Sequence, residues 1–145
     1  MTTRVAQSAD ATETEALGAE LAADLQPGDV VLVLGELGSG KTTLVRGAAH
    51  ALGVSDPVTS PTFSIGHRYH GADVTVSHLD LYRLHSLTHE DPELLADYFG
   101  PGRIAFVEWP QAADGELSDA RARVTLHHAG ADRRRIEIEI EDSEA

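Results

Sequence analysis

A glycine-rich segment at residues 35–42 ends in a lysine and a threonine, and its residue types and spacing suit the binding of phosphate. It reads Gly-Glu-Leu-Gly-Ser-Gly-Lys-Thr and matches the pattern GxxxxGK(S/T) at every fixed position. Glycines let the backbone curl so that N–H groups point at phosphate oxygens, and the start of a following helix adds a partial positive charge. The residues predicted to form this nucleotide-binding loop are Gly35, Glu36, Leu37, Gly38, Ser39, Gly40, Lys41 and Thr42.

Lys41 is the only lysine of the chain, since ten of the eleven basic residues are arginine. A lysine kept at this one place indicates a task that needs a compact ammonium on a flexible stem instead of a planar guanidinium. In such a loop the ammonium reaches the β- and γ-phosphates, while the hydroxyl of Thr42 is offered to Mg²⁺. The sequence therefore predicts a nucleoside triphosphate with Mg²⁺, and no motif distinguishes adenine from guanine.

Two acidic residues at the ends of predicted strands are candidates for the metal side of this site. Asp80 ends the segment 74–79, and Glu108 follows the more apolar run 104–107. A carboxylate at the end of a neighbouring strand is needed to hold the metal or its waters. By hydrophobicity alone Glu108 is the more typical choice, and an acid that simply faces water remains the alternative for either residue. Thr42, Asp80 and Glu108 are the predicted metal-side residues.

The elements that must position these residues follow from hydrophobic periodicity. Residues 30–34 form a continuous and mostly β-branched apolar run, which is typical of a parallel strand covered on both faces. Leucines repeat at helical spacing over residues 10–26, where Asp10 can cap the helix, and a second helix follows the loop and ends at Gly53. The loop thus lies between a strand and a helix, which is the context that its pattern requires.

The second half of the chain adds further strands. Residues 62–70 and 74–82 alternate as strands, a short helix opens at Asp91-Pro92 and runs to Tyr98, and residues 122–126 and 136–140 form a hairpin. We therefore predict one domain over residues 1–145, an α/β fold of the P-loop NTPase type. It is a three-layer sandwich whose sheet is mostly parallel, with the C-terminal antiparallel hairpin at its edge.

The amino-acid composition argues against direct binding to nucleic acid or to a membrane. Twenty-four acidic and eleven basic residues give a formal charge of −13, which disfavours autonomous binding to a phosphate backbone. The chain has no cysteine, no apolar run near the ~20 residues that a membrane span needs, and no signal-peptide pattern. A cytoplasmic protein with no membrane association is expected, and any nucleic acid is expected to be held by a partner.

Four short segments, in this order, resemble the TsaE family, also called YjeE. They are Gly-Glu-Leu-Gly-Ser-Gly-Lys-Thr-Thr from residue 35, Ser60-Pro61-Thr62-Phe63, the segment His-Leu-Asp-Leu-Tyr-Arg-Leu at 78–84, and Glu108-Trp109-Pro110. The resemblance extends over almost the whole chain. It implies the ATPase component of bacterial tRNA threonylcarbamoyladenosine synthesis, which acts with TsaB and TsaD and meets tRNA only through that complex.

The resemblance also implies roles for particular positions. Thr43 joins Lys41 and Thr42 at the phosphates, and Asp80 becomes the metal-side acid, which reverses the order given by hydrophobicity. Thr62 is implied to meet the γ-phosphate side, and Glu108 to orient water or the metal shell. The catalytic residues are then Lys41, Asp80, Glu108 and Thr62. The family further implies ATP as the nucleotide, slow hydrolysis by the chain alone, and stimulation within the complex.

Several alternatives stay open at this point. A small-molecule kinase would need an arginine-rich lid and an acceptor pocket, and a nucleotide-sensing module would hydrolyse ATP only incidentally. The side chains whose roles are divided between function and structure are His78, Arg83, Trp109 and the cluster Arg133–Arg135. The pair His127-His128 is expected to be exposed instead of metal-binding, because neighbouring residues on a strand face opposite ways.

Overall fold

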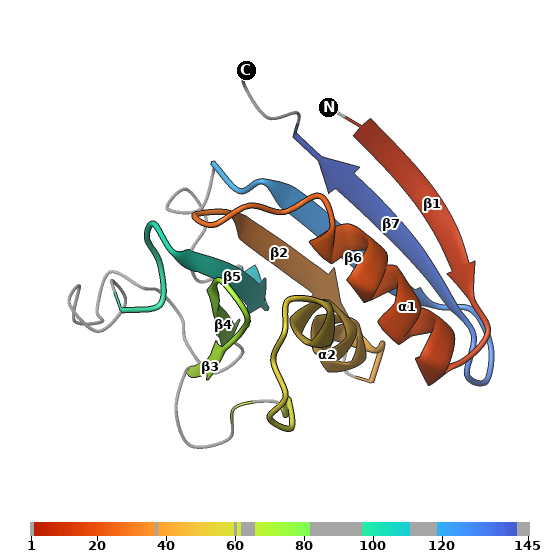
Figure 1. The fold of residues 1–145 in the computed structure, drawn as a ribbon. Helices are drawn as coiled ribbons and strands as arrows, with labels where there is room; N and C mark the ends of the chain where they lie inside the picture. Colours follow the sequence, from red (N-terminus) through yellow and green to blue (C-terminus); the bar gives the residue numbers. More distant parts are fainter. Residues whose placement is uncertain are drawn as a thin grey trace.

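The computed structural model describes residues 2–36, 38–59, 61, 66–81, 97–110 and 119–141. These residues form a seven-stranded sheet in the order β1-β7-β6-β2-β5-β4-β3, with two helices packed on it (Figure 1). The elements are β1 (Thr2–Ser8), α1 (Ala11–Ala22), β2 (Val30–Gly35), α2 (Lys41–Ala51), β3 (Gly66–His70), β4 (Thr75–Asp80), β5 (Arg103–Glu108), β6 (Ala122–His128) and β7 (Arg134–Ile140).

The centre of the sheet is parallel and both edges are antiparallel. Strands β6, β2, β5 and β4 run parallel to one another, whereas β3 pairs antiparallel with β4, and β7 pairs antiparallel with both β6 and β1. The apolar run at residues 30–34 is confirmed as the central strand, with buried valine and leucine side chains on both faces. The α/β fold of the P-loop type, with a parallel sheet centre, is therefore confirmed.

The edge position predicted for the C-terminal hairpin was wrong. Strands β6 and β7 do form an antiparallel hairpin, but β1 pairs along the whole of β7 and takes the edge. The sequence of β1, TTRVAQS, gives no alternation of apolar and polar residues, because most of its side chains are exposed. An edge strand with solvent on both sides carries little periodicity, so sequence reasoning left it unassigned.

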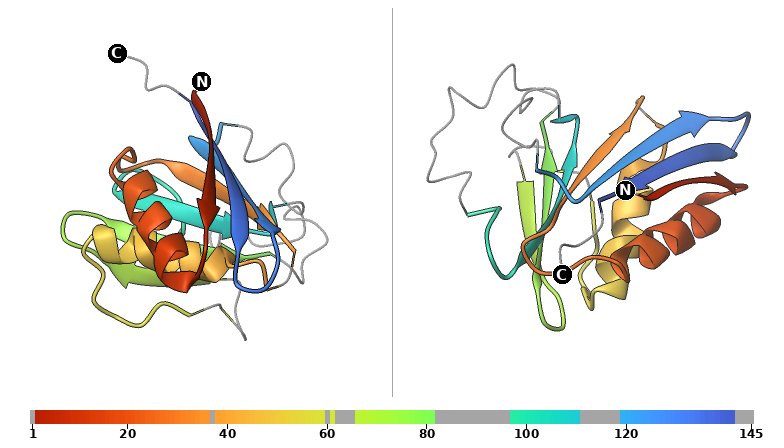
Figure 2. Two further views of the ribbon diagram at one scale, coloured as in Figure 1. Left: turned by 90° about the vertical axis from the view of Figure 1, so that its right-hand side faces the viewer. Right: turned by 90° about the horizontal axis from the view of Figure 1, so that it is seen from above.

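Both described helices lie on one face of the sheet, as the two views of Figure 2 show. Leu17 and Leu21 of α1 and Leu44 of α2 belong to a core cluster that includes β2, β5 and β6 side chains. The opposite face has its own cluster, built around Leu32, Leu79, Val107 and Tyr98. Most of the helix expected from Asp91 lies outside the described residues. Neither described helix is long and apolar enough to cross a membrane.

Helix α1 begins where the sequence predicts and ends earlier. The Asp10 side chain caps it by accepting a hydrogen bond from the Glu13 N–H at 2.9 Å, while the helix stops at Ala22 instead of continuing to residue 26. Helix α2 spans Lys41–Ala51, and the left-handed Gly53 follows its C-cap Leu52. The expected strand 62–70 is observed from Gly66, since its first residues lie outside the described part.

Helices α1 and α2 approach closely through two glycines, and this contact gives a first testable prediction. A Cβ added at Gly47 would lie 2.0 Å from the Glu15 carbonyl oxygen, and one added at Gly18 would lie 2.1 Å from that of Leu44. Helix propensity alone would make Gly47→Ala stabilising by about 1 kcal/mol. We expect the opposite sign, a loss of about 1–3 kcal/mol, because backbone atoms must move apart.

Urea unfolding of the Gly47→Ala variant and of the parent chain measures this change in the free energy of unfolding. Ala51→Ser, at an exposed position of the same helix, serves as the control and should change the free energy of unfolding by less than about 0.7 kcal/mol. A Gly47→Ala variant as stable as the parent would show that the helices are not held at this distance.

Candidate nucleotide-binding site

The phosphate loop connects the end of β2 to the start of α2, as its pattern predicts. Gly35, Gly38 and Gly40 adopt φ angles of +151°, +73° and +100°, a region that side-chain-bearing residues rarely adopt. A Cβ at Gly35 would also lie 2.5 Å from the Ser39 hydroxyl and 2.8 Å from the Leu126 carbonyl oxygen. Gly40 is the N-cap of α2 and offers no side-chain acceptor to the first helical N–H groups. The curl of this loop therefore depends on glycine.

Lys41 lies over this loop with its ammonium group held by main-chain oxygens. Its Nζ donates to the carbonyl oxygens of Gly35 and Glu36, each at 2.9 Å, and lies 4.4 Å from the centre of the Trp109 ring. Burial lowers the pKa of Lys41, while Glu108 and Asp80 act in the opposite direction and favour the charged form. An ammonium that is poorly solvated gains more from a phosphate oxygen than one in open water.

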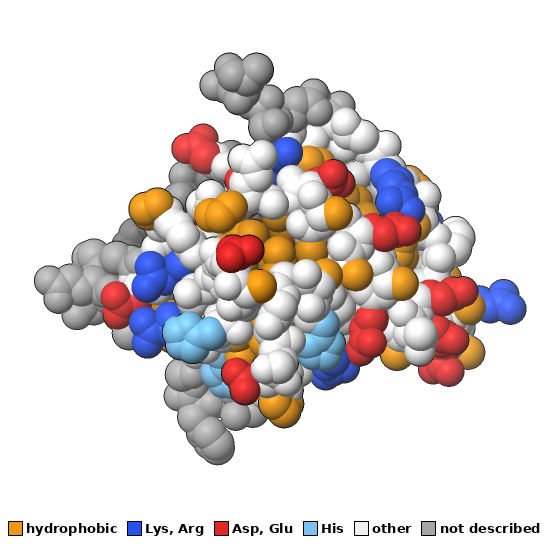
Figure 3. All heavy atoms as spheres, in the orientation of Figure 1, with side chains coloured by type: hydrophobic (Ala, Val, Ile, Leu, Met, Phe, Trp, Pro, Cys, Tyr) orange, Lys and Arg blue, Asp and Glu red, His pale blue; other side chains and the backbone are white. Residues whose placement is uncertain are grey.

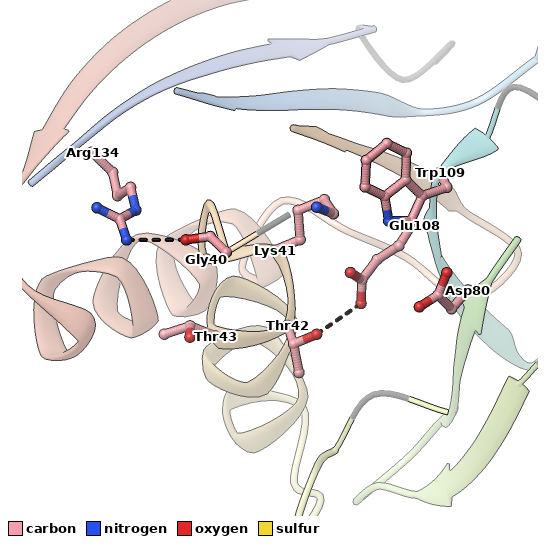
Figure 4. Close-up of a pocket in the computed structure, with 9 residues that line it drawn as sticks. Gly40, Lys41, Thr42, Thr43, Asp80, Glu108, Trp109 and Arg134 are labelled. Atoms are coloured by element: carbon pink, nitrogen blue, oxygen red, sulfur yellow. Dashed lines mark hydrogen bonds between the residues drawn. The ribbon is translucent and has the colours of Figure 1, made fainter. Parts of the chain in front are cut away.

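The two predicted acids lie side by side on neighbouring parallel strands. Asp80 and Glu108 are register partners at the carboxyl ends of β4 and β5. The Thr42 hydroxyl donates to Glu108 Oε2 at 3.0 Å, and Figure 4 shows the Asp80 carboxylate on the same side of the cleft. The structure thus brings together the three residues that the sequence nominated for the metal side.

His78 is part of the support for Glu108. Its side chain is fully buried in β4, and its Nε2 hydrogen-bonds to the same Glu108 oxygen that accepts from Thr42. Because a carboxylate can only accept, Nε2 donates in this pair. The other ring nitrogen, Nδ1, is buried and has no hydrogen-bond partner among the residues that the structure describes. Of the two interpretations left open for His78, a histidine bonded inside the sheet is the one observed, and it fixes an acid of the site.

Trp109 follows Glu108 in an unusual backbone conformation. Its φ of +55° lies in the left-handed region, where a bulky residue is rare. The half-buried ring stacks beside the Lys41 ammonium and forms part of the cleft wall (Figure 4). Strained backbone of this kind is typical of functional sites.

These residues surround a cleft of about 330 Å³. Its walls are formed by Gly38, Gly40, Lys41, Thr42, Thr43, Asp80, Glu108, Trp109 and Arg134. Thr43 is therefore at the cleft, as the family resemblance implied. Three other nominated residues, Leu37, Thr62 and Arg83, lie outside the described residues.

Arg134 at the start of β7 is the contact that sequence reasoning did not resolve. Its Nε donates to the Ser39 carbonyl oxygen at 2.9 Å and its Nη2 to that of Gly38 at 3.1 Å. The sequence offered a signal, a run of three arginines in an acidic chain, but could not tell a charged turn from a contact to the site. The structure resolves this for Arg134, which lines the cleft opposite the acids (Figure 4).

The donor set fits a nucleotide with Mg²⁺. The Ser39 hydroxyl is buried within the loop and has no hydrogen-bond partner in the described part of the chain, and the first turn of α2 faces the cleft. Among the described residues no group of three His, Asp or Glu side chains could hold a metal by itself. Mg²⁺ held together with phosphates needs only one or two carboxylates, and Asp80 and Glu108 supply these.

Comparisons with known proteins converge on one family. A family model described as threonylcarbamoyl adenosine biosynthesis protein TsaE matches residues 8–136. A Bacillus subtilis protein named tRNA threonylcarbamoyladenosine biosynthesis protein TsaE is 37% identical over 125 residues, covering 86% of this chain and 77% of that protein. A Streptomyces coelicolor protein of the same name is 41% identical over 118 residues, covering 80% of each. The crystal structure of YdiB from Bacillus subtilis matches with a TM-score of 0.74 at 31% identity, covering 94% of this chain and 84% of that one.

Proposed function

Because this chain belongs to the TsaE family, we propose that it is a Mg²⁺-dependent ATPase that drives or resets the complex for tRNA N6-threonylcarbamoyladenosine modification. The observation that carries the proposal is the meeting of Lys41 and Thr42 with two carboxylates in one cleft at the carboxyl ends of the parallel strands. Ligands of such sheets bind at this edge, and nucleoside triphosphates bind where a glycine-rich loop opens a helix.

Four residues of the cleft have defined roles in this proposal. Lys41 turns from the loop carbonyls to the β- and γ-phosphates, where its ammonium offsets negative charge. Thr42 and Asp80 would hold a Mg²⁺ ion, which would offset the negative charge of the phosphates during transfer. Glu108, anchored by His78, orients the attacking water.

The reaction is the displacement of ADP by water. The water oxygen forms a bond to the γ-phosphorus as the bond from that atom to the β–γ bridging oxygen breaks, giving ADP, inorganic phosphate and a proton. The protein supplies mainly orientation and electrostatic stabilisation to such a transfer. With Glu108 already engaged by Thr42 and His78, the chain alone is proposed to turn over slowly.

The partners are proposed to be TsaB and TsaD, with tRNA contacted only through their complex. The chain carries a formal charge of −13, and on the face viewed in Figure 3 acidic and basic side chains are interspersed. Such a surface does not favour direct binding of a phosphate backbone. The transfer of the threonylcarbamoyl group would then belong to TsaD.

Turnover measured with and without partners tests this function. The chain is expected to hydrolyse ATP slowly alone and faster with purified TsaB and TsaD homologues, and ATP is expected to change their co-elution. Failure to associate under any nucleotide condition would count against the proposal. Phosphorylation of a small acceptor would instead favour the kinase, and binding without turnover in the complex would favour the sensor.

A further inference from the structure

Arg134 links the β6–β7 hairpin turn to the phosphate loop. To the described residues it donates four hydrogen bonds, all to main-chain carbonyl oxygens. Those of Gly38 and Ser39 lie in the phosphate loop, and those of Ala131 and Arg133 lie in the hairpin turn. One planar guanidinium therefore joins two segments that are more than 90 residues apart in sequence.

The bonds from Arg134 complete a pattern around the loop. Lys41 Nζ holds the carbonyl oxygens of Gly35 and Glu36, and Arg134 holds those of Gly38 and Ser39. In a trans peptide the N–H points opposite to the C=O, so a fixed Ser39 carbonyl also fixes the direction of the Gly40 N–H. Two cations thus orient peptide planes of the loop, and the bond from Arg134 to the Ser39 carbonyl sets the direction of the Gly40 N–H.

Arg134 also occupies a distinct place in the cleft. Asp80, Glu108 and Trp109 line one side, and Arg134 lies beyond the loop on the other (Figure 4). If the γ-phosphate and the cation occupy the acidic side, the remaining phosphates lie nearer to Arg134. The positive charge of Arg134 at that end acts on the α- and β-phosphates, which ADP and ATP share.

We propose that Arg134 is a positioning residue of the nucleotide site, which holds the phosphate loop in its binding conformation and stabilises ADP and ATP equally. This inference rests on the proposed nucleotide binding and goes beyond it, because it assigns a role to a side chain on the C-terminal hairpin. The neighbouring Arg133 and Arg135 are exposed, and neither donates a side-chain hydrogen bond to the described residues of the loop; Arg135 instead pairs with Glu137 at 3.4 Å. They are matched controls for charge.

Calorimetric titration of Mg-ATP and Mg-ADP into each variant tests the proposal. Arg134→Gln should raise both dissociation constants by the same factor, about tenfold, because two hydrogen bonds to the loop are lost. Arg133→Gln and Arg135→Gln, which remove the same charge, should stay within about twofold. Arg134→Lys should recover little, since a single ammonium cannot span both loop carbonyls and the turn.

The outcomes separate this inference from the proposed function. If the parent chain binds neither nucleotide, the proposed function fails and the inference fails with it. If the parent binds and Arg134→Gln matches the two controls, or Arg134→Lys restores full affinity, only the positioning role is overturned. Thermal unfolding of Arg134→Gln without nucleotide completes the test. If the loss of affinity is explained by a lower melting temperature of the variant, the positioning role of Arg134 is also overturned.

Discussion

Nucleotide binding is expected to be lost when Lys41 is replaced by alanine. The ammonium is the loop's own cation, and its side chain is only 5% exposed between two carbonyl oxygens and the Trp109 ring. Two charge-assisted hydrogen bonds to phosphate are each worth about 1.5–3 kcal/mol, so the dissociation constant for Mg-ATP should rise by at least about a hundredfold. Calorimetric titration measures this change, and nucleotide-dependent association with TsaB and TsaD should disappear with it.

Two further variants serve as controls for the Lys41→Ala result. Lys41→Arg keeps the charge but replaces a compact ammonium by a wider planar group, so it should also bind poorly. Arg46→Gln, on the same helix, removes a half-exposed cation that lies 3.6 Å from Glu15, and it should leave affinity within about twofold. Normal nucleotide affinity in a folded Lys41→Ala variant would contradict the assignment of this loop.

The strand, loop and helix around Lys41 were predictable because their signals are local. Val30–Gly35 is an apolar run between turn residues, and the glycines at 35, 38 and 40 stand where positive φ angles are required. The rule that the carboxyl ends of parallel strands lie at the same edge of a sheet also predicts that Asp80 and Glu108 lie near the loop, and they are register partners there. Local pattern and sheet geometry were therefore sufficient for the centre of the site.

The parts that were not predictable depend on contacts between distant segments. Strand β1 is exposed along most of its length, so only its pairing with β7 defines it. The bond from Thr42 to Glu108 spans 66 residues, and that from Arg134 to Ser39 spans 95. No periodicity encodes which arginine of a run of three reaches the loop, since that choice depends on the register of the β6–β7 hairpin.

Replacing Glu108 should slow ATP hydrolysis without weakening ATP binding, which distinguishes its role from that of Asp80. Glu108 Oε2 accepts hydrogen bonds from both Thr42 and His78, and a glutamine oxygen can accept the same two bonds. Glu108→Gln therefore preserves shape and contacts and removes only the charge. We expect it to bind Mg-ATP within a few-fold of the parent and to hydrolyse it about 10²–10³ times more slowly, as loss of an acid–base or orienting group does. Single-turnover hydrolysis with the partner proteins present measures this rate.

Asp80→Asn is the companion variant, and it should act on a different quantity. The Asp80 carboxylate lies beside Glu108 at the end of β4, whereas the Thr42 hydroxyl donates to Glu108. If it holds the cation, its loss should raise the Mg²⁺ concentration needed for half-maximal turnover, whereas Glu108→Gln should leave that concentration unchanged. Glu139→Gln on β7 controls for the removal of one acidic charge. A Glu108→Gln variant with the parent rate and an altered Mg²⁺ requirement would reverse the two roles, because the carboxylate joined to Thr42 would then serve the metal and Asp80 the water.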